Sequence, residues 1–185
     1  MSYAIPVDEL SISKMEAFRR ATKEAMLERA KLKLGVRNME ELIFRELLPA
    51  TDLGQGATGY TNETYLTGAI AAITWTSVYD TAVVPQLWND RVIGFYKIAY
   101  EEVNPLITLV RFREGNTGAT TKAVFNIEPF VYVKLTPEVY LSEPVVYDPN
   151  SWVFIECYAR AAIGAAGHHL AFGCFVAEPA GGNVS

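Results

Sequence analysis

The spacing of apolar and polar residues divides the chain into a helical beginning and a β-rich remainder. The segment SKME at 13–16 fits a capping box, in which the side chains of Ser13 and Glu16 satisfy free N–H groups at a helix start. Strong helix formers without Pro or Gly continue to Leu34, and Gly35 is a typical helix end. The pattern therefore predicts a helix over about residues 13–34.

A second, shorter helix is predicted directly afterwards. Asn38 begins a capping pattern, apolar residues follow at 42, 43, 47 and 48, and Pro49 ends the segment. The apolar side of residues 1–49 is too narrow to form a core of its own, so we expect this helical arm to dock on another subunit. The residues expected to make these contacts are Met15, Phe18, Ala21, Ala25, Leu32, Leu42, Ile43 and Leu47.

Residues 50–64 are rich in Gly and Thr, which predicts a linker between the arm and a β-rich body at 65–185. In the body, β-branched and aromatic residues gather in about eight short segments that turn signals separate. This spacing predicts a mainly β domain, either an antiparallel β-sandwich or a jelly-roll-like barrel of about eight strands.

Several of these segments carry apolar residues on both alternating faces, as in VFIECYA at 153–159 and LAFGCFV at 170–176. An antiparallel strand with one face in water should alternate between apolar and polar residues. We therefore expect a second buried face, covered by a neighbouring subunit.

Composition favours a globular domain that buries surface between subunits, because half of the 185 residues are apolar and only 20% are charged. No apolar run is long enough for a membrane helix, and the first residues lack the basic and apolar regions of a signal peptide. Two cysteines do not make a disulfide framework. We therefore expect a soluble protein, made in a reducing compartment and without a membrane partner.

The net charge of −5 is unevenly distributed along the chain. Residues 1–37 contain eight Lys or Arg and five Asp or Glu, whereas residues 38–185 contain eight and sixteen. Because an acidic body repels nucleic acid, direct contact with nucleic acid is not expected.

One short motif resembles a nucleotide-binding fingerprint. The residues GQGATG at 54–59 match G-x-G-x-x-G, but the fingerprint needs a strand before it and a helix after it. Here a helical segment precedes the motif and a Thr-rich segment follows it. We interpret it as part of the linker, with no nucleotide cofactor.

The only cluster with metal-ligand chemistry is formed by His168, His169 and Cys174, and Cys157 could approach Cys174 across a hairpin near 164–167. A structural zinc site needs four ligands, usually in two closely spaced pairs, and this segment has no such pairs. We therefore expect no metal, with the cysteines in the core and the histidines beside a turn.

No pattern for a catalytic nucleophile is present, and the acidic residues Glu101, Glu102 and Glu128 fall at predicted strand ends or turns. We therefore do not expect an enzyme. The tryptophans at 75, 88 and 152, with ten tyrosines, could form a carbohydrate-stacking surface, or could pack in a core or a subunit interface.

A helical arm, a Gly/Thr linker and one eight-strand β domain with few charges together resemble the jelly-roll coat and cement (decoration) proteins of viruses and phages. The likeness lies in the layout from about Tyr65 to Pro179, especially in NPLITLVRFREGNTG and YLSEPVVYDPNSWVFIECYA. It implies an arm that reaches across neighbouring subunits. At a net charge of +3 for residues 1–37, this arm is less basic than the arms of coat proteins that package RNA.

The resulting hypothesis is a structural protein of a virion, either a main coat or a decoration subunit, that is made in the host cytoplasm. It would act by self-association and arm exchange, and its partners would be its own copies and other capsid subunits. Two alternatives stay open. One is a carbohydrate- or receptor-binding β-sandwich, and the other is a barrel enzyme of the cupin type, which would bind a metal.

Overall fold

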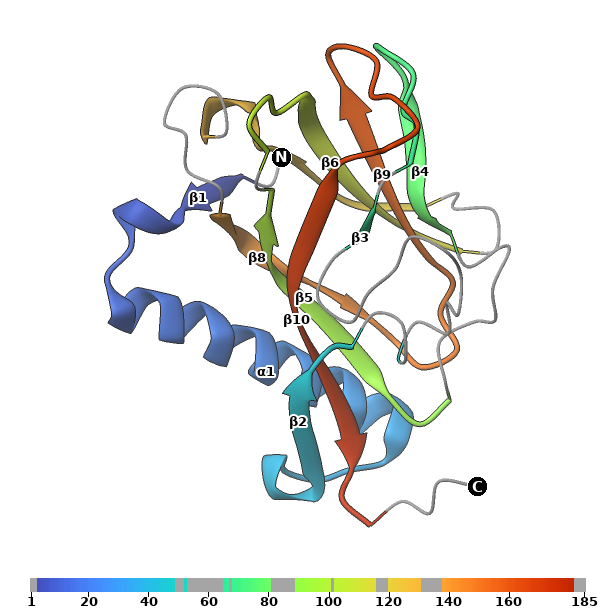
Figure 1. Ribbon diagram of the computed structural model, residues 1–185. Coiled ribbons are helices and arrows are strands. Elements are labelled where there is room, and N and C mark those ends of the chain that lie inside the picture. The colour runs from blue at the N-terminus through green and yellow to red at the C-terminus, as the bar shows by residue number, and fades with distance from the viewer. Residues whose placement is uncertain are drawn as a thin grey trace.

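The computed structural model of the protein describes residues 3–48, 52, 65–66, 68–80, 89–100, 102–115, 120–130 and 138–181 (Figure 1). Over these residues the chain is mainly β, with two antiparallel sheets, one α-helix and two short 3₁₀ turns. In chain order the elements are β1 (Ala4–Pro6), η1 (Val7–Glu9), α1 (Ile12–Leu34), η2 (Met39–Glu41), β2 (Leu42–Glu46), β3 (Tyr65–Leu66), β4 (Trp75–Asp80), β5 (Val92–Ala99), β6 (Ile107–Glu114), β7 (Thr120–Asn126), β8 (Glu138–Tyr147), β9 (Val153–Ala159) and β10 (His169–Pro179).

The larger sheet has the strand order β1-β8-β5-β10-β2, and β3 also pairs with β10. The smaller sheet has the order β4-β9-β6-β7. The expectation of a mainly β protein built from antiparallel sheets is therefore confirmed, and the arrangement is consistent with a β-sandwich.

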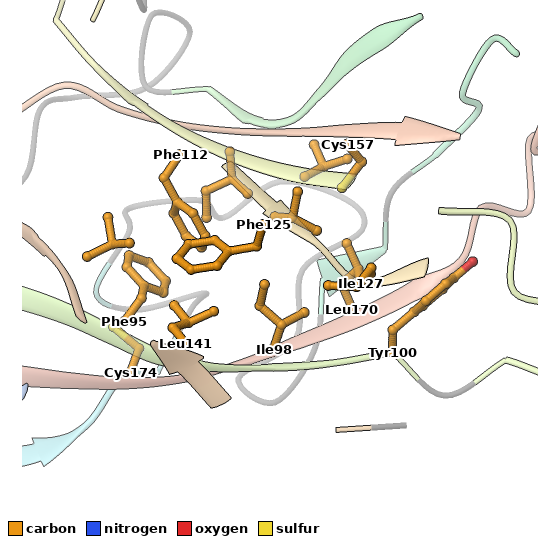
Figure 2. Close-up of a cluster of buried hydrophobic side chains, with 14 of the residues drawn as sticks. Phe95, Ile98, Tyr100, Phe112, Phe125, Ile127, Leu141, Cys157, Leu170 and Cys174 are labelled. Atoms are coloured by element: carbon orange, nitrogen blue, oxygen red, sulfur yellow. The ribbon is translucent and has the colours of Figure 1, made fainter. Parts of the chain in front are cut away.

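Aromatic and aliphatic side chains from both sheets meet between them (Figure 2). Phe95 on β5 packs against Phe112 on β6 with ring centroids 5.2 Å apart, and Phe112 meets Phe125 of β7 edge to face. All three rings are fully buried. These contacts hold the two sheets together, because each buried aromatic side chain removes a large apolar area from water.

Helix α1 covers the other side of the larger sheet, away from β4, β9 and β6 (Figure 1). It buries Thr22, Met26 and Ala30 against a second apolar cluster that includes Tyr96 and Phe175. The predicted helix is thus confirmed. Its N-cap is Ser11, whose side chain accepts a hydrogen bond from the Lys14 N–H, rather than the expected Ser13.

The predicted second helix is wrong, because its apolar residues form strand β2. This strand pairs with β10 along its whole length, from Leu42 opposite Pro179 to Glu46 opposite Phe175. The capping signal at Asn38 is real, since its side chain accepts hydrogen bonds from two N–H groups of the 3₁₀ turn η2. The turn ends after Glu41, and pairing with a distant strand then determines the structure.

The first part of the chain packs on the β-rich body of the same chain and adds two strands to its larger sheet. Strand β1 pairs with β8, β2 pairs with β10, and α1 packs on β5, β8 and β10. The second buried face of β10, expected to lie against a neighbouring subunit, is therefore covered by α1 of the same chain. Within the segment expected to be a linker, the structure describes only Asp52.

A substitution of Gly94 on β5 tests how closely α1 approaches the sheet. A Cβ atom at this position would lie 2.6 Å from Sδ and 2.8 Å from Cγ of Met26. We expect Gly94→Ala to lower the free energy of unfolding by about 1–3 kcal/mol, because the core there has no room for a methyl group.

Urea unfolding followed by circular dichroism measures this change. The control is Gly164→Ala, where nothing lies within 4 Å of the added Cβ, and its expected effect is within about 0.5 kcal/mol. Equal stabilities of the two variants would show that α1 does not pack on β5 in this way.

Candidate contact surfaces

The hydroxyl of Tyr100, just after β5, joins three segments of the chain. It accepts hydrogen bonds from the N–H groups of Leu106 at 2.8 Å and Ile107 at 3.3 Å, and it also bonds to Nδ1 of His168. A phenol has one proton, and here both N–H groups point at its oxygen, so the O–H donates to Nδ1. This assigns the ring proton of neutral His168 to Nε2 and gives the residue a structural role.

His169 begins β10 beside the carboxylate of Glu102. Its backbone N–H donates to Oε1 of Glu102 at 2.9 Å, and its Nδ1 lies 3.7 Å from the same oxygen. Among the described residues, no group of three or more His, Cys, Asp or Glu side chains is arranged to hold a metal ion. The three candidate ligands are thus separated, with Cys174 buried in the core.

The two cysteines lie in different sheets, so the predicted approach of Cys157 to Cys174 across a hairpin is wrong. Cys157 belongs to β9 of the smaller sheet, and Cys174 belongs to β10 of the larger one (Figure 2). Both are free and buried, and desolvation raises the pKa of each thiol well above its ordinary value. They are core residues, as the sequence predicts.

A buried group of charges fixes the end of β2 to its neighbours. The carboxylate of Asp52 accepts two hydrogen bonds of 2.6 Å from Arg45 and one of 3.0 Å from Arg91. Arg45 also bonds to Glu178 on β10, and the bond to Asp52 raises the pKa of Arg45 above its ordinary value. Both arginines have anionic partners, so this group links β2 to its neighbours rather than offering a binding site.

The outer face of the smaller sheet carries an ordered set of aromatic and charged residues. The strand register places Trp75, Tyr158 and Leu109 side by side in one row, and Ser77, Glu156 and Arg111 in the next. Helix α1, the one α-helix among the described residues, makes its main contacts with β5, β8 and β10 of the other sheet. We refer to these six residues as the outer face.

The charges on the outer face hold one another in place. Nε of Arg111 donates to Glu156 at 2.7 Å, and Arg113 donates to the same carboxylate at 3.1 Å. The guanidinium of Arg111 also lies 4.1 Å from the centre of the Trp75 ring, which in turn packs against Tyr158. Stacking and ion pairing therefore fix the side chains of this face before any partner binds.

A second surface is an open groove between α1 and the strands β1 and β8. Its volume is about 600 Å³ and its walls are mostly apolar. We refer to it as the α1 groove, and its residues are Ile5, Glu9, Leu10, Lys14, Ala17, Phe18, Ala21, Thr22, Leu141, Ser142 and Pro144.

The eight residues predicted to contact other subunits fall into three groups. Leu42 and Leu47 are buried within the chain, and Met15, Phe18 and Ala25 are half-buried. Phe18 and Ala21 line the α1 groove. Ala21, Leu32 and Ile43 are exposed, the last two at 76% and 52% of their surface. The residues accessible to another chain are therefore mainly those of the groove, with Leu32 and Ile43. Contacts with another chain stay a prediction.

The other residues considered as functional candidates are scattered. Glu128 is exposed, and Trp152 is half-buried. The G-x-G-x-x-G motif at 54–59, Trp88 and Glu101 lie outside the described residues. The outer face was missed because its charges, Arg111 and Glu156, are visible in the sequence but their pairing across strands is not.

No protein-family model matches the chain, and no curated protein matches it significantly. None of the described helices has the length and apolarity needed to cross a membrane.

The burial of both cysteines predicts the reactivity of their thiols. In the native protein at pH 8, we expect a thiol reagent such as Ellman's reagent to label them at least about a hundredfold more slowly than in denaturant, because the thiolate is disfavoured and the sulfur is inaccessible. The release of thionitrobenzoate measures both rates. Rapid stoichiometric labelling of the folded protein would contradict the burial of the two residues.

The hydroxyl of Tyr100 predicts a loss of stability in Tyr100→Phe. Removing it leaves the buried N–H of Ile107 without its acceptor, and we expect the free energy of unfolding to fall by about 1–3 kcal/mol. The control is Tyr158→Phe on the outer face, where the ring is half-buried and the expected change is within about 0.5 kcal/mol. Similar urea midpoints for the two variants would contradict the structural role of the Tyr100 hydroxyl.

Proposed function

We propose that the protein is a non-catalytic structural subunit of a virus or phage particle, either a coat or a decoration protein, that acts by self-association. Its partners are its own copies and other capsid subunits, and it reaches the virion from the host cytoplasm.

The strand order carries this proposal. Apart from the short strands β1 and β3, eight strands follow along the chain from β2 to β10. The first pairs with the last (β2 with β10), the second with the seventh (β4 with β9), the third with the sixth (β5 with β8) and the fourth with the fifth (β6 with β7). We interpret this order as one long folded hairpin rolled into two sheets, and we propose on this basis that the fold is jelly-roll-like.

Jelly rolls occur in viral coat proteins, in lectins and in cupins, so the strand order alone gives an analogy of fold. The outer face favours a contact role within that group. Tryptophan, tyrosine and arginine are enriched where proteins bind each other, and fixed side chains lose little entropy on binding. Trp75, Tyr158 and Arg111 supply these residue types on one sheet face.

The helical segment contributes to the proposed self-association without being exchanged between subunits. If residues 1–49 were exchanged between subunits, β1 and β2 would no longer pair with β8 and β10 of their own chain. A neighbouring subunit would then have to supply both strands. We therefore propose that this segment contributes the exposed side of α1 as a contact surface while it stays on its own body.

A carbohydrate-binding protein is the second candidate, because the half-buried rings of Trp75 and Tyr158 lie side by side on one sheet face next to Ser77. Aromatic rings of this kind can stack on sugars. Against it, the guanidinium of Arg111 already lies 4.1 Å from the centre of the Trp75 ring and occupies one of its sides.

Native mass tests the proposal. We expect light scattering after size exclusion to show species larger than a monomer whose mass rises with concentration, and negative-stain images to show closed particles or tubes. Trp75→Ala should weaken this association at least about tenfold, because truncating a central tryptophan removes a large share of interface energy.

The matched control is Val103→Ala, which shortens a fully exposed apolar residue away from the outer face and should leave association unchanged. A monomer at every concentration would overturn the assembly proposal. If that monomer bound a glycan array and Trp75→Ala abolished the binding, the carbohydrate alternative would take its place.

A further inference from the structure

Along the side of α1 that lines the groove, alanines and charged residues lie at equal spacings before and after one central residue. Ala21 is its centre, Ala17 and Ala25 lie four residues before and after it, and Lys14 and Glu28 lie seven before and after. Residues spaced by three, four and seven fall on one side of a helix. On this side Lys14, Ala17 and Ala21 line the α1 groove and Ala25 lies next to β8, beside the side that buries Met26 and Ala30 on the sheet.

The charges on this side are complementary under a two-fold rotation. If two copies of α1 lie antiparallel with Ala21 of each at the axis, Lys14 of one copy faces Glu28 of the other, and the same pair forms again on the opposite side. Both residues are exposed, and Glu28 uses only Oε1 to contact Lys31 of its own helix. An antiparallel pair therefore gains two ion pairs, whereas a parallel pair would place like charges together.

The apolar residues follow the same symmetry. Leu32 lies eleven residues after Ala21, and Leu10, which lines the end of the groove, lies eleven before it. Leu32 is 76% exposed and is therefore accessible to a second chain. In the antiparallel arrangement, Leu32 of each copy reaches the Leu10 end of the other copy's groove. The alanines at the centre are small enough to let the two helices approach closely, and Phe18 beside them packs against Tyr140 of its own chain.

We infer that the α1 groove is a two-fold contact between two copies of this chain, in which antiparallel α1 helices cross at Ala21. The inference rests on the proposed self-association and adds a second contact, on the opposite side of the molecule from the outer face (Figure 1). A subunit needs two different contacts to build a particle, because a single two-fold contact closes as a dimer.

A charge reversal tests the pairing. Lys14→Glu and Glu28→Lys should each raise the dissociation constant of the dimer at least about tenfold, because each places like charges opposite one another. The double variant restores both pairs and should return to within about threefold of the original. Sedimentation equilibrium measures these constants, and the experiment is run in the Trp75→Ala background so that only the groove contact is read.

The matched control lies on the same helix, outside this side. Arg20 pairs with Glu24 of its own helix at 3.6 Å, and Arg20→Glu makes the same change of charge as Lys14→Glu. It should leave the dissociation constant unchanged. Equal effects of Arg20→Glu and Lys14→Glu, or a double variant that fails to recover, would overturn the inference.

Engineered cysteines test the register directly, because the two native cysteines are buried. Ala21→Cys should form a disulfide-linked dimer under mild oxidation, since its two copies meet at the axis. Ala17→Cys should link to Ala25→Cys when the two proteins are mixed, and to a lesser extent to itself. No link at Ala21 would overturn the inference.

The outcomes separate this inference from the proposed function. Particles that depend on Trp75 but give no link at Ala21 would overturn the groove contact and leave the assembly role intact. A dimer linked at Ala21 that never forms a larger species would support the groove contact and overturn the role in a particle.

Discussion

Strand β10 is the element on which the rest of the structure depends. It pairs with β5 on one side and with β2 on the other, and its alternate side chains face two different cores. Cys174 and Val176 point between the sheets, whereas Phe175 and Ala177 point towards α1. Because both faces of this strand are apolar, the larger sheet needs a cover, and α1 provides it within the chain.

This constraint explains which elements could be predicted from the sequence. The long helix was found because strong helix formers run without a break to Gly35, which is a local signal. The strands of the body were found because their β-branched and aromatic residues lie between turn signals. Strand β2 was missed because a short apolar run fits a helix or a strand, and its partner residues, such as Glu178 opposite Ile43, lie more than a hundred residues away.

The contact surfaces show the same division between local and long-range information. Leu32 was predicted as a contact residue from helix periodicity, and it is exposed, whereas Leu47 was predicted in the same way and is buried in the main core. The outer face depends on register, since Arg111 and Glu156 become neighbours only when β6 and β9 pair. A single sequence states which residues are charged, but not which strands lie side by side.

The composition of α1 now has a physical explanation. A helix that only covered a sheet would need one broad apolar side and a strongly charged opposite side. Here the side against the sheet contains small and flexible residues, Thr22, Met26 and Ala30, because Gly94 brings the backbone of β5 very close. The side next to the groove combines alanines with charges of both signs and ends in the exposed Leu32. A helix of this composition is better suited to lie between its own sheet and a second chain than to face solvent alone.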